Sequence, residues 1–240
     1  MAPAFTIRGL FRFGWEKTRQ NSGLVFKAIL IFVGVSIAQG IARAAIHNPL
    51  AMGLVVLAAD LAEIAVSAGL IAISLKLSRG EPSSLRDLVP PFRTVLRYLL
   101  ALLAAGLIVV LSMLLPLGIG IGIFIAFPSP RLGLATLAVI CIAAGVLIGI
   151  YLGVRYSLVR VAAIDRKDSI SGILRTSMRL TRGFVWKIVL FSIVAALLNI
   201  LGAILFLVGL ILTMPITIFA FTRLYLILEE RSATDPAAAN

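Results

Sequence analysis

The chain has 240 residues, of which 61% are hydrophobic and only 13% are charged, and its mean hydropathy is +1.11. Soluble domains contain about 25% charged and about 45–50% apolar residues, so this chain has too few polar side chains to cover a water-exposed globule. Its 22 Lys and Arg against 10 Asp and Glu give a net charge of +12. In so apolar a chain this excess predicts membrane topology rather than nucleic-acid binding.

The first 23 residues are too basic for a secretory signal, because Arg8, Arg12, Lys17 and Arg19 occupy the place of its apolar centre. We expect the mature chain to begin near Met1. The segment predicts an amphipathic helix instead, since apolar and basic residues fall on different faces of a 3.6-residue period. The apolar face holds Ile7, Leu10, Phe11 and Trp15, and the basic face holds Arg8, Arg12 and Arg19.

Apolar runs long enough to cross a bilayer follow at Leu24–Ala45, Leu50–Leu75, Val95–Leu117, Leu132–Val154 and Trp186–Leu228. A crossing needs about 20 residues, so the last tract predicts two helices, with a turn between Asn199 and Gly209. Pro215 should kink or start the second of them. The sequence therefore predicts an all-α polytopic membrane protein with six transmembrane helices in three hairpins.

Two groups of glycines are expected to affect the continuity and the packing of these helices. Gly118, Gly120 and Gly122 follow Pro116 and should loosen the third helix near its outer end, with a break or a re-entrant segment as the alternative. Gly145, Gly149 and Gly153 recur every four residues, a spacing that favours close helix packing, with a hinge or a substrate path as the alternative.

The basic residues are distributed very unevenly about the predicted spans. The region up to Lys27, the segments Lys76–Arg97 and Arg155–Lys187, and the C-terminal end hold 20 of the 22 Lys and Arg; the opposite side holds Arg43 and Arg131. Because basic residues are retained on the cytoplasmic side, we expect both termini in the cytoplasm of a cell-membrane protein.

An internal repeat relates the two ends of the chain. Positions 7–19 match positions 170–182 at an offset of 163, and positions 23–30 match 183–190 at an offset of 160, with nine identities in 21 pairs. A weaker copy begins at Ser83–Leu88, where Ser84 and Asp87 fit a capping box and Pro90-Pro91 keeps the helix short. We expect three units within one domain, 1–228, at about 5–78, 83–158 and 169–228, followed by a polar tail at 229–240.

Each unit should begin with an interfacial amphipathic helix. The second strongly basic one places Ile170, Ile173, Leu174 and Met178 opposite Arg175, Arg179 and Arg182. Membrane lipids are the expected partners, and the basic faces would either bind anionic lipid or a partner at the cytoplasmic face or serve as ordinary positive-inside anchors. The sequence identifies no protein partner.

Three segments, Gly69–Phe92, Arg155–Lys187 and Val208–Leu228, resemble a group of uncharacterised prokaryotic polytopic proteins related to the membrane domain of glycerophosphoryl diester phosphodiesterases. The shared pattern consists of Gly, Ser, Arg, Pro and a late Tyr, here Tyr225. The resemblance implies a fold and a membrane location. It implies no enzymatic activity, because the catalytic barrel of those enzymes has no counterpart in this sequence.

Two acidic residues, Asp60 and Glu63, share a helix face about ten and thirteen residues into the second apolar run. An ionised carboxylate at such a depth costs about 2.5–3.5 kcal/mol or more. The pair therefore predicts either a proton- or cation-linked path or a neutral, hydrogen-bonded pair with Gln39 or Arg43 as a partner.

The sequence shows no catalytic, cofactor or metal motif. His47 is the only histidine and Cys141 the only cysteine, the Asp165–Asp168 segment has the character of a solvated turn, and Asp168 or Ser169 should cap the next helix. We therefore expect a structural or accessory membrane component, with a small proton- or ion-coupled transporter as the alternative.

Overall fold

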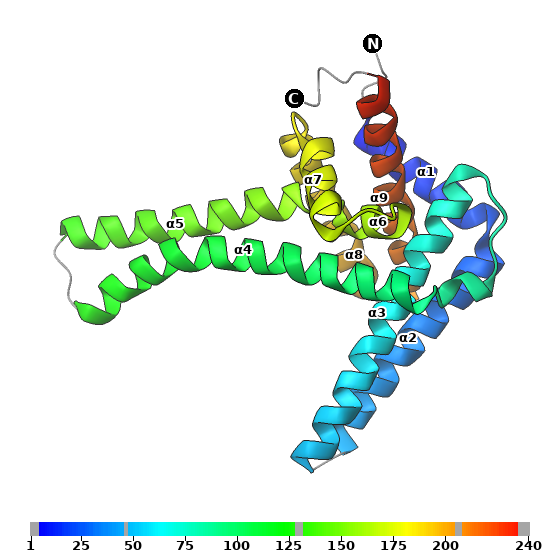
Figure 1. Cartoon of the computed structure of the whole chain (residues 1–240), viewed down its shortest axis with the longest axis horizontal. Helices are drawn as coiled ribbons and strands as arrows, with labels where there is room; N and C mark the ends of the chain where they lie inside the picture. Colours follow the sequence, from blue (N-terminus) through cyan, green and yellow to red (C-terminus); the bar gives the residue numbers. More distant parts are fainter. Residues whose placement is uncertain (1–4, 46–47, 128–131, 205–207, 235–240) are drawn as a thin grey trace.

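The computed structural model describes residues 5–45, 48–127, 132–204 and 208–234. Every regular element in this part of the chain is a helix (Figure 1). The elements are α1 (Ile7–Gln20), α2 (Ser22–Ala45), α3 (Pro49–Arg79), the 3₁₀ helix η1 (Leu85–Leu88), α4 (Phe92–Ala126), α5 (Leu132–Arg155), α6 (Val159–Asp165), α7 (Ile170–Thr181), α8 (Val185–Ile204) and α9 (Val208–Thr234).

Six helical segments are long and apolar enough to cross a membrane. They are α2, α3, α4, the α5–α6 segment, α8 and α9. Helices suit this role because they satisfy all their backbone hydrogen bonds internally, away from water. The chain is thus an all-α polytopic membrane protein, as the sequence predicts.

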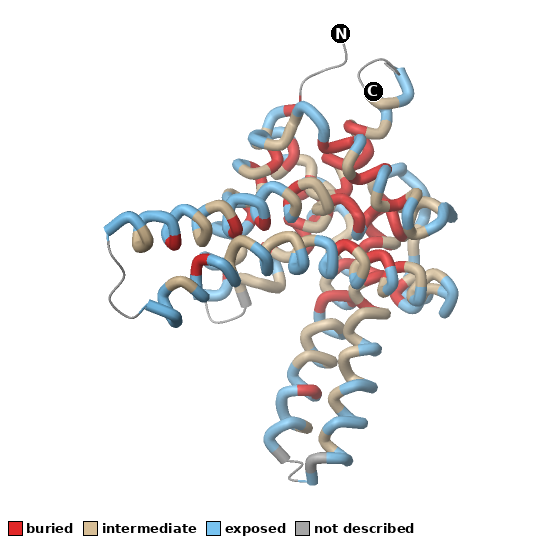
Figure 2. The backbone as a smooth tube through the Cα atoms, turned by 60° about the vertical axis from the view of Figure 1, so that its left-hand side comes forward, coloured by how far each residue is buried: buried red, intermediate tan, exposed pale blue. Residues whose placement is uncertain are grey.

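The six spans form three hairpins, α2–α3, α4–α5 and α8–α9, that diverge from a shared centre. In Figure 1 the α2–α3 and α4–α5 hairpins project in different directions, and α8–α9 lies between their bases. We call the centre, made of α1, η1, α6, α7 and the adjoining ends of α3, α4, α5, α8 and α9, the hub. Figure 2 shows that buried residues concentrate there, whereas the projecting hairpins are mostly exposed or half-buried.

Helix α9 is the central element of the hub. Of its most apolar window, 56% of the residues are buried, compared with 17–28% for the other five spans. It packs against α1, α2, α3 and α8, and Phe219, Leu224 and Tyr225 are among the largest fully buried side chains. The first turn of α1 and the last turn of α9 lie beside each other, lining one cleft.

The two basic amphipathic helices, α1 and α7, each bury one face against the rest of the protein. Thr6 caps α1 by accepting a hydrogen bond from the Gly9 N–H (3.2 Å), and Ser169 caps α7 as predicted, accepting from the Gly172 N–H (3.3 Å). Residues at the predicted offset of 163 are buried in both helices: Leu10, Gly14 and Thr18 in α1, and Ile173, Ser177 and Thr181 in α7.

Some details depart from the expected interfacial helices. The apolar face of α1 packs on α8 and α9, with the Phe11 and Phe191 rings 5.3 Å apart, and Trp15 is 46% exposed rather than part of that face. The middle unit begins with the four-residue η1 instead of an α-helix, because the following prolines restrict the backbone. Its predicted capping box is formed.

The alternative of a break or a re-entrant segment at Gly118–Gly122 is wrong, because α4 continues without interruption to Ala126. The reason is close packing between the two helices of the hairpin. A Cβ on Gly120 would lie 2.7 Å from the Ala138 carbonyl oxygen and 2.6 Å from Ile142 Cγ1 on α5, whereas Gly118 and Gly122 have open space around them.

Helix α9 also extends beyond its predicted end. It runs through Pro215 and ends at Thr234, so residues 229–234 are helical rather than part of the polar tail. The expected turn between α8 and α9 lies outside the described residues, since α8 ends at Ile204 and α9 begins at Val208.

We predict that Gly120→Ala lowers stability by about 1–3 kcal/mol, because an added methyl group forces the α4 and α5 backbones apart. Gly118→Ala and Gly122→Ala provide matched controls in the same helix. They should be neutral or stabilising by up to about 1 kcal/mol, since alanine favours a helix where nothing obstructs it. Thermal unfolding in detergent measures all three, and an equal response at the three positions would contradict the packing described.

Candidate functional site

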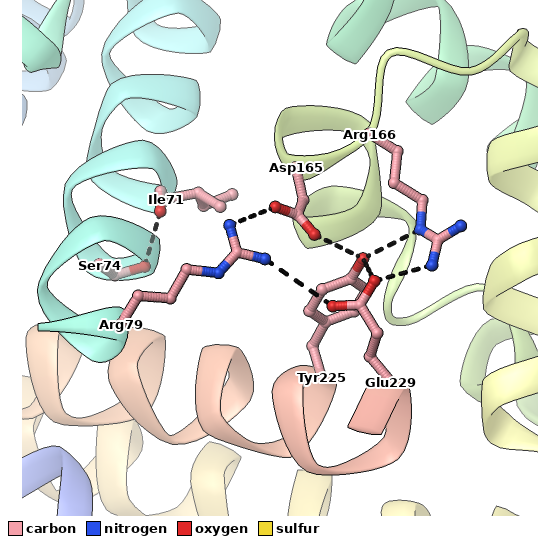
Figure 3. A network of polar contacts seen from close by, with 7 residues as sticks. All are labelled: Ile71, Ser74, Arg79, Asp165, Arg166, Tyr225 and Glu229. Carbon is pink, nitrogen blue, oxygen red and sulfur yellow. Dashed lines mark hydrogen bonds and ion pairs between the residues drawn. The ribbon is translucent and has the colours of Figure 1, made fainter. Parts of the chain in front are cut away.

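A network of charged side chains joins the three hairpins at the hub (Figure 3). Arg79, the last residue of α3, pairs with Asp165 at the end of α6 (Nη1 to Oδ1, 2.6 Å). Arg166, the next residue, pairs with Glu229 of α9 (Nη2 to Oε1, 2.7 Å). Arg79 also approaches Glu229 at 3.8 Å. The ends of α3, α6 and α9 thus contribute charges to the same cluster.

The hydroxyl of Tyr225 lies at the centre of the network. It is within 3.0 Å of Asp165 Oδ2 and 3.3 Å of Glu229 Oε1, to which it can donate, and it accepts from Arg166 Nε at 3.4 Å. The Tyr225 residue is fully buried. A buried phenol needs a hydrogen-bond partner, and this one is surrounded by three.

Each arginine of the network faces carboxylates. Arg79 and Arg166 pair with Asp165 and Glu229, Arg166 also approaches a third carboxylate, Asp168, at 3.7 Å, and the Asp165 side chain is only 8% exposed. The hydrogen bond with Tyr225, together with the contact to Glu229, raises the pKa of Arg166 above its ordinary value. Arg166 therefore keeps its charge at neutral pH, and its ion pairs cross-link α6 and α9.

A second polar contact between α3 and α9 lies near this network. The hydroxyls of Ser74 and Thr222 are 2.8 Å apart and buried, and Ser74 also donates to the Ile71 carbonyl at 2.8 Å. Each hydroxyl has a partner, so the contact is favourable in an apolar interior.

Sequence reasoning missed this network. The prediction of a solvated turn at Asp165–Asp168 is wrong for Asp165 and Arg166, because α6 ends against α3 and α9, and Glu229 belongs to α9. One signal was available: Tyr225 and Glu229 are four residues apart, so they share a helix face. The partners on α3 and α6 could not be identified without the fold.

The predicted intramembrane residues come together within the α2–α3 hairpin. Asp60 accepts hydrogen bonds from Gln39 and, at 3.2 Å, from Arg43 Nη2, and Glu63 accepts one from Ser36 at 3.3 Å. Gln39 is buried, whereas the Arg43 and Asp60 side chains are 48% and 47% exposed. Both carboxylates are thus bonded to the neighbouring helix.

The predicted glycine face is divided. A Cβ on Gly145 would lie 2.8 Å from Leu117 Cγ, and one on Gly149 would collide with Met113 Sδ, so both glycines lie where α4 and α5 are in close contact. The prediction is wrong for Gly153, which is exposed and has no atom of another element within 4 Å of such a Cβ. Gly153 instead lines a groove beside the hub.

The predicted basic residues lie on the outer surface of the hub. The exposed set comprises Arg8, Arg12, Arg19, Arg175, Arg179 and Arg182, of which Arg12 pairs with Glu16 at 2.8 Å. Both tryptophans of the chain, Trp15 and Trp186, are also exposed here. Exposed tryptophan beside basic residues is typical of a membrane–water interface.

The remaining polar residues singled out in the sequence are Asp87 with Ser84, near η1, and His47. Near η1, Asp87 accepts from Lys76 Nζ (2.6 Å) and from the Ser84 N–H (2.9 Å), and these bonds lower its pKa. His47 lies outside the described residues. Within the described ranges, no group of three or more His, Cys, Asp and Glu side chains comes together in a way that could hold a metal ion.

No protein-family model, curated protein or solved structure matches this chain.

We predict that Glu229→Gln lowers the free energy of unfolding by about 1.5–3 kcal/mol, because it weakens charged hydrogen bonds to two arginines. Glu230→Gln is the matched control. This neighbour is exposed and its carboxylate makes no ion pair within the described residues, so its substitution should change stability by less than about 0.5 kcal/mol. Equal effects of the two changes on thermal unfolding in detergent would refute a stabilising network.

Proposed function

We propose that this chain is a non-enzymatic component of the cytoplasmic membrane, with a structural or accessory role. The proposal is supported by the observation that the charged side chains of the ion network and the acids of the α2–α3 hairpin are paired or hydrogen-bonded within the protein. At the hub, Arg79 and Arg166 are paired with the carboxylates of Asp165, Asp168 and Glu229. In the α2–α3 hairpin, Asp60 and Glu63 are both hydrogen-bonded to α2.

The resemblance to the membrane domain of glycerophosphoryl diester phosphodiesterases agrees with this proposal. It concerns helical membrane segments alone, and the all-α fold with six spans is compatible with it. The Tyr225 of the shared pattern lies at the centre of the ion network, which gives that residue a structural role.

Both termini lie in the cytoplasm in this proposal. The 20-to-2 distribution of Lys and Arg supports it, as does the even number of spans. The basic hub surface with its two exposed tryptophans would then face the inner membrane–water interface. The three units related by the repeat would each contribute one hairpin.

The topology can be tested by thiol labelling in a Cys141→Ala background. Single cysteines at His47 and Ser129 should react with an impermeant reagent on intact cells, whereas cysteines at Glu81 and Lys167 should react only after permeabilisation. Labelling of Glu81 or Lys167 positions in intact cells would invert the proposed orientation.

The alternative role, a small proton- or ion-coupled transporter, depends on Asp60 and Glu63 taking up and releasing charge. We predict that the purified protein in proteoliposomes dissipates neither an imposed pH gradient nor a cation gradient. Asp60→Asn with Glu63→Gln should fold with equal or greater stability, since it removes charges while preserving shape and hydrogen bonds. A flux present in the unmodified protein and absent in this double variant would instead establish the transporter.

A further inference from the structure

A groove of about 800 Å³ lies beside the hub, among the membrane-spanning helices. Its walls come from α3, α4, the α5–α6 segment, α8 and α9, all of which belong to predicted spans. The volume is in the range of ligand sites, about 300–1,000 Å³. In a bilayer such a groove is in contact with lipid chains rather than with water.

The lining changes character along the groove. Arg160 and Ser157 lie at the hub end, where α5 passes into α6. Leu102, Val109 and Val110 line it along α4, over about 12 Å at 1.5 Å per residue, whereas α8 and α9 contribute polar side chains, among them Asn199 and Thr217, which are hydrogen-bonded to each other at 3.2 Å. The groove thus has one cationic end and an apolar wall extending into the span, the two features of a phospholipid site.

Arg160 differs from the arginines of the ion network. It is exposed, and it has no carboxylate partner in the described part of the chain, whereas Arg79 and Arg166 are each paired. An arginine beside apolar spans is stabilised by an anion, and its planar guanidinium binds phosphate oxygens in a bidentate manner. Basic pockets between spans on the cytoplasmic side bind anionic lipid head groups.

We propose that this groove binds an anionic phospholipid of the surrounding membrane. The phosphate lies at Arg160, and an acyl chain runs along α4 past Gly106 towards Val110. The site is separate from the basic surface of α1 and α7, because Arg160 lies on α6 and its ligand enters between the spans.

The chain offers variants that separate head-group recognition from chain binding. Arg160→Gln removes the cation, and Arg160→Lys keeps it. Gly106→Leu adds a side chain to the groove lining at a position where the space around the Cβ is open. The matched controls are Arg175→Gln, an exposed arginine on α7, and Gly118→Leu, an equally open glycine of α4 outside the groove.

The test measures binding of phosphatidylglycerol and phosphatidylcholine with identical chains to the purified full-length protein, by native mass spectrometry and by thermal shift in detergent. We expect phosphatidylglycerol to bind about tenfold more tightly than phosphatidylcholine, because both lipids offer a phosphate to Arg160 but only phosphatidylcholine carries a choline cation that repels the guanidinium. Arg160→Gln should abolish the preference, Arg160→Lys should retain most of it, and Gly106→Leu should weaken both lipids. The two controls should bind like the unmodified protein.

Several results would overturn the proposal. Equal binding of the two lipids would exclude recognition of the head group. An effect of Arg175→Gln as large as that of Arg160→Gln would show that only the general surface charge attracts the lipid. An effect of Gly118→Leu as large as that of Gly106→Leu would show that lipid covers the helices without occupying the groove.

Discussion

The ion network of Arg79, Asp165, Arg166 and Glu229 is the constraint on which the arrangement of the hairpins depends. Charges near a bilayer are costly unless they are paired, and removing one partner of a buried pair leaves the other uncompensated. Here the partners come from the ends of α3, α6 and α9. The tips of the hairpins therefore lie apart, whereas their bases are joined through this network.

The hairpins are held internally by different means. In α4–α5, Gly120, Gly145 and Gly149 allow the two helices to approach closely, and small residues favour such packing in membranes, where the hydrophobic effect gives no drive for association. In α2–α3, Asp60 joins Gln39 and Arg43 instead. The two projecting hairpins are thus joined internally by different contacts, close packing at glycines in α4–α5 and polar side chains in α2–α3.

The sequence predicts the parts of the fold that follow from hydropathy and helix periodicity. The six spans, the buried faces of α1 and α7, and the Ser169 cap of α7 are local properties, readable from apolar runs and residue spacing. The partners of Asp60 are also within reach of such reasoning, because an acid in a hairpin must bond to the adjacent helix.

The ion network could not be predicted in this way, because its members are separated by up to 150 positions and meet only through the fold. Asp165 and Arg166 have the composition of a solvated turn until α3 and α9 are placed around them. At Gly118–Gly122, helix propensity and packing favour different structures. The glycines indicate a break by helix propensity, but in a hairpin one of them provides the packing contact that supports a continuous helix.

The most direct test of the hub is the coupling between α3 and α6, measured by a double-mutant cycle of Arg79→Gln and Asp165→Asn on the free energy of unfolding in detergent. Because these two side chains are in contact at 2.6 Å, we expect a coupling energy above about 1 kcal/mol, so the double variant should lose less stability than the two single variants combined. Additive effects within about 0.5 kcal/mol would show that the pair acts as two independent groups, and would contradict a hub held together by its charges.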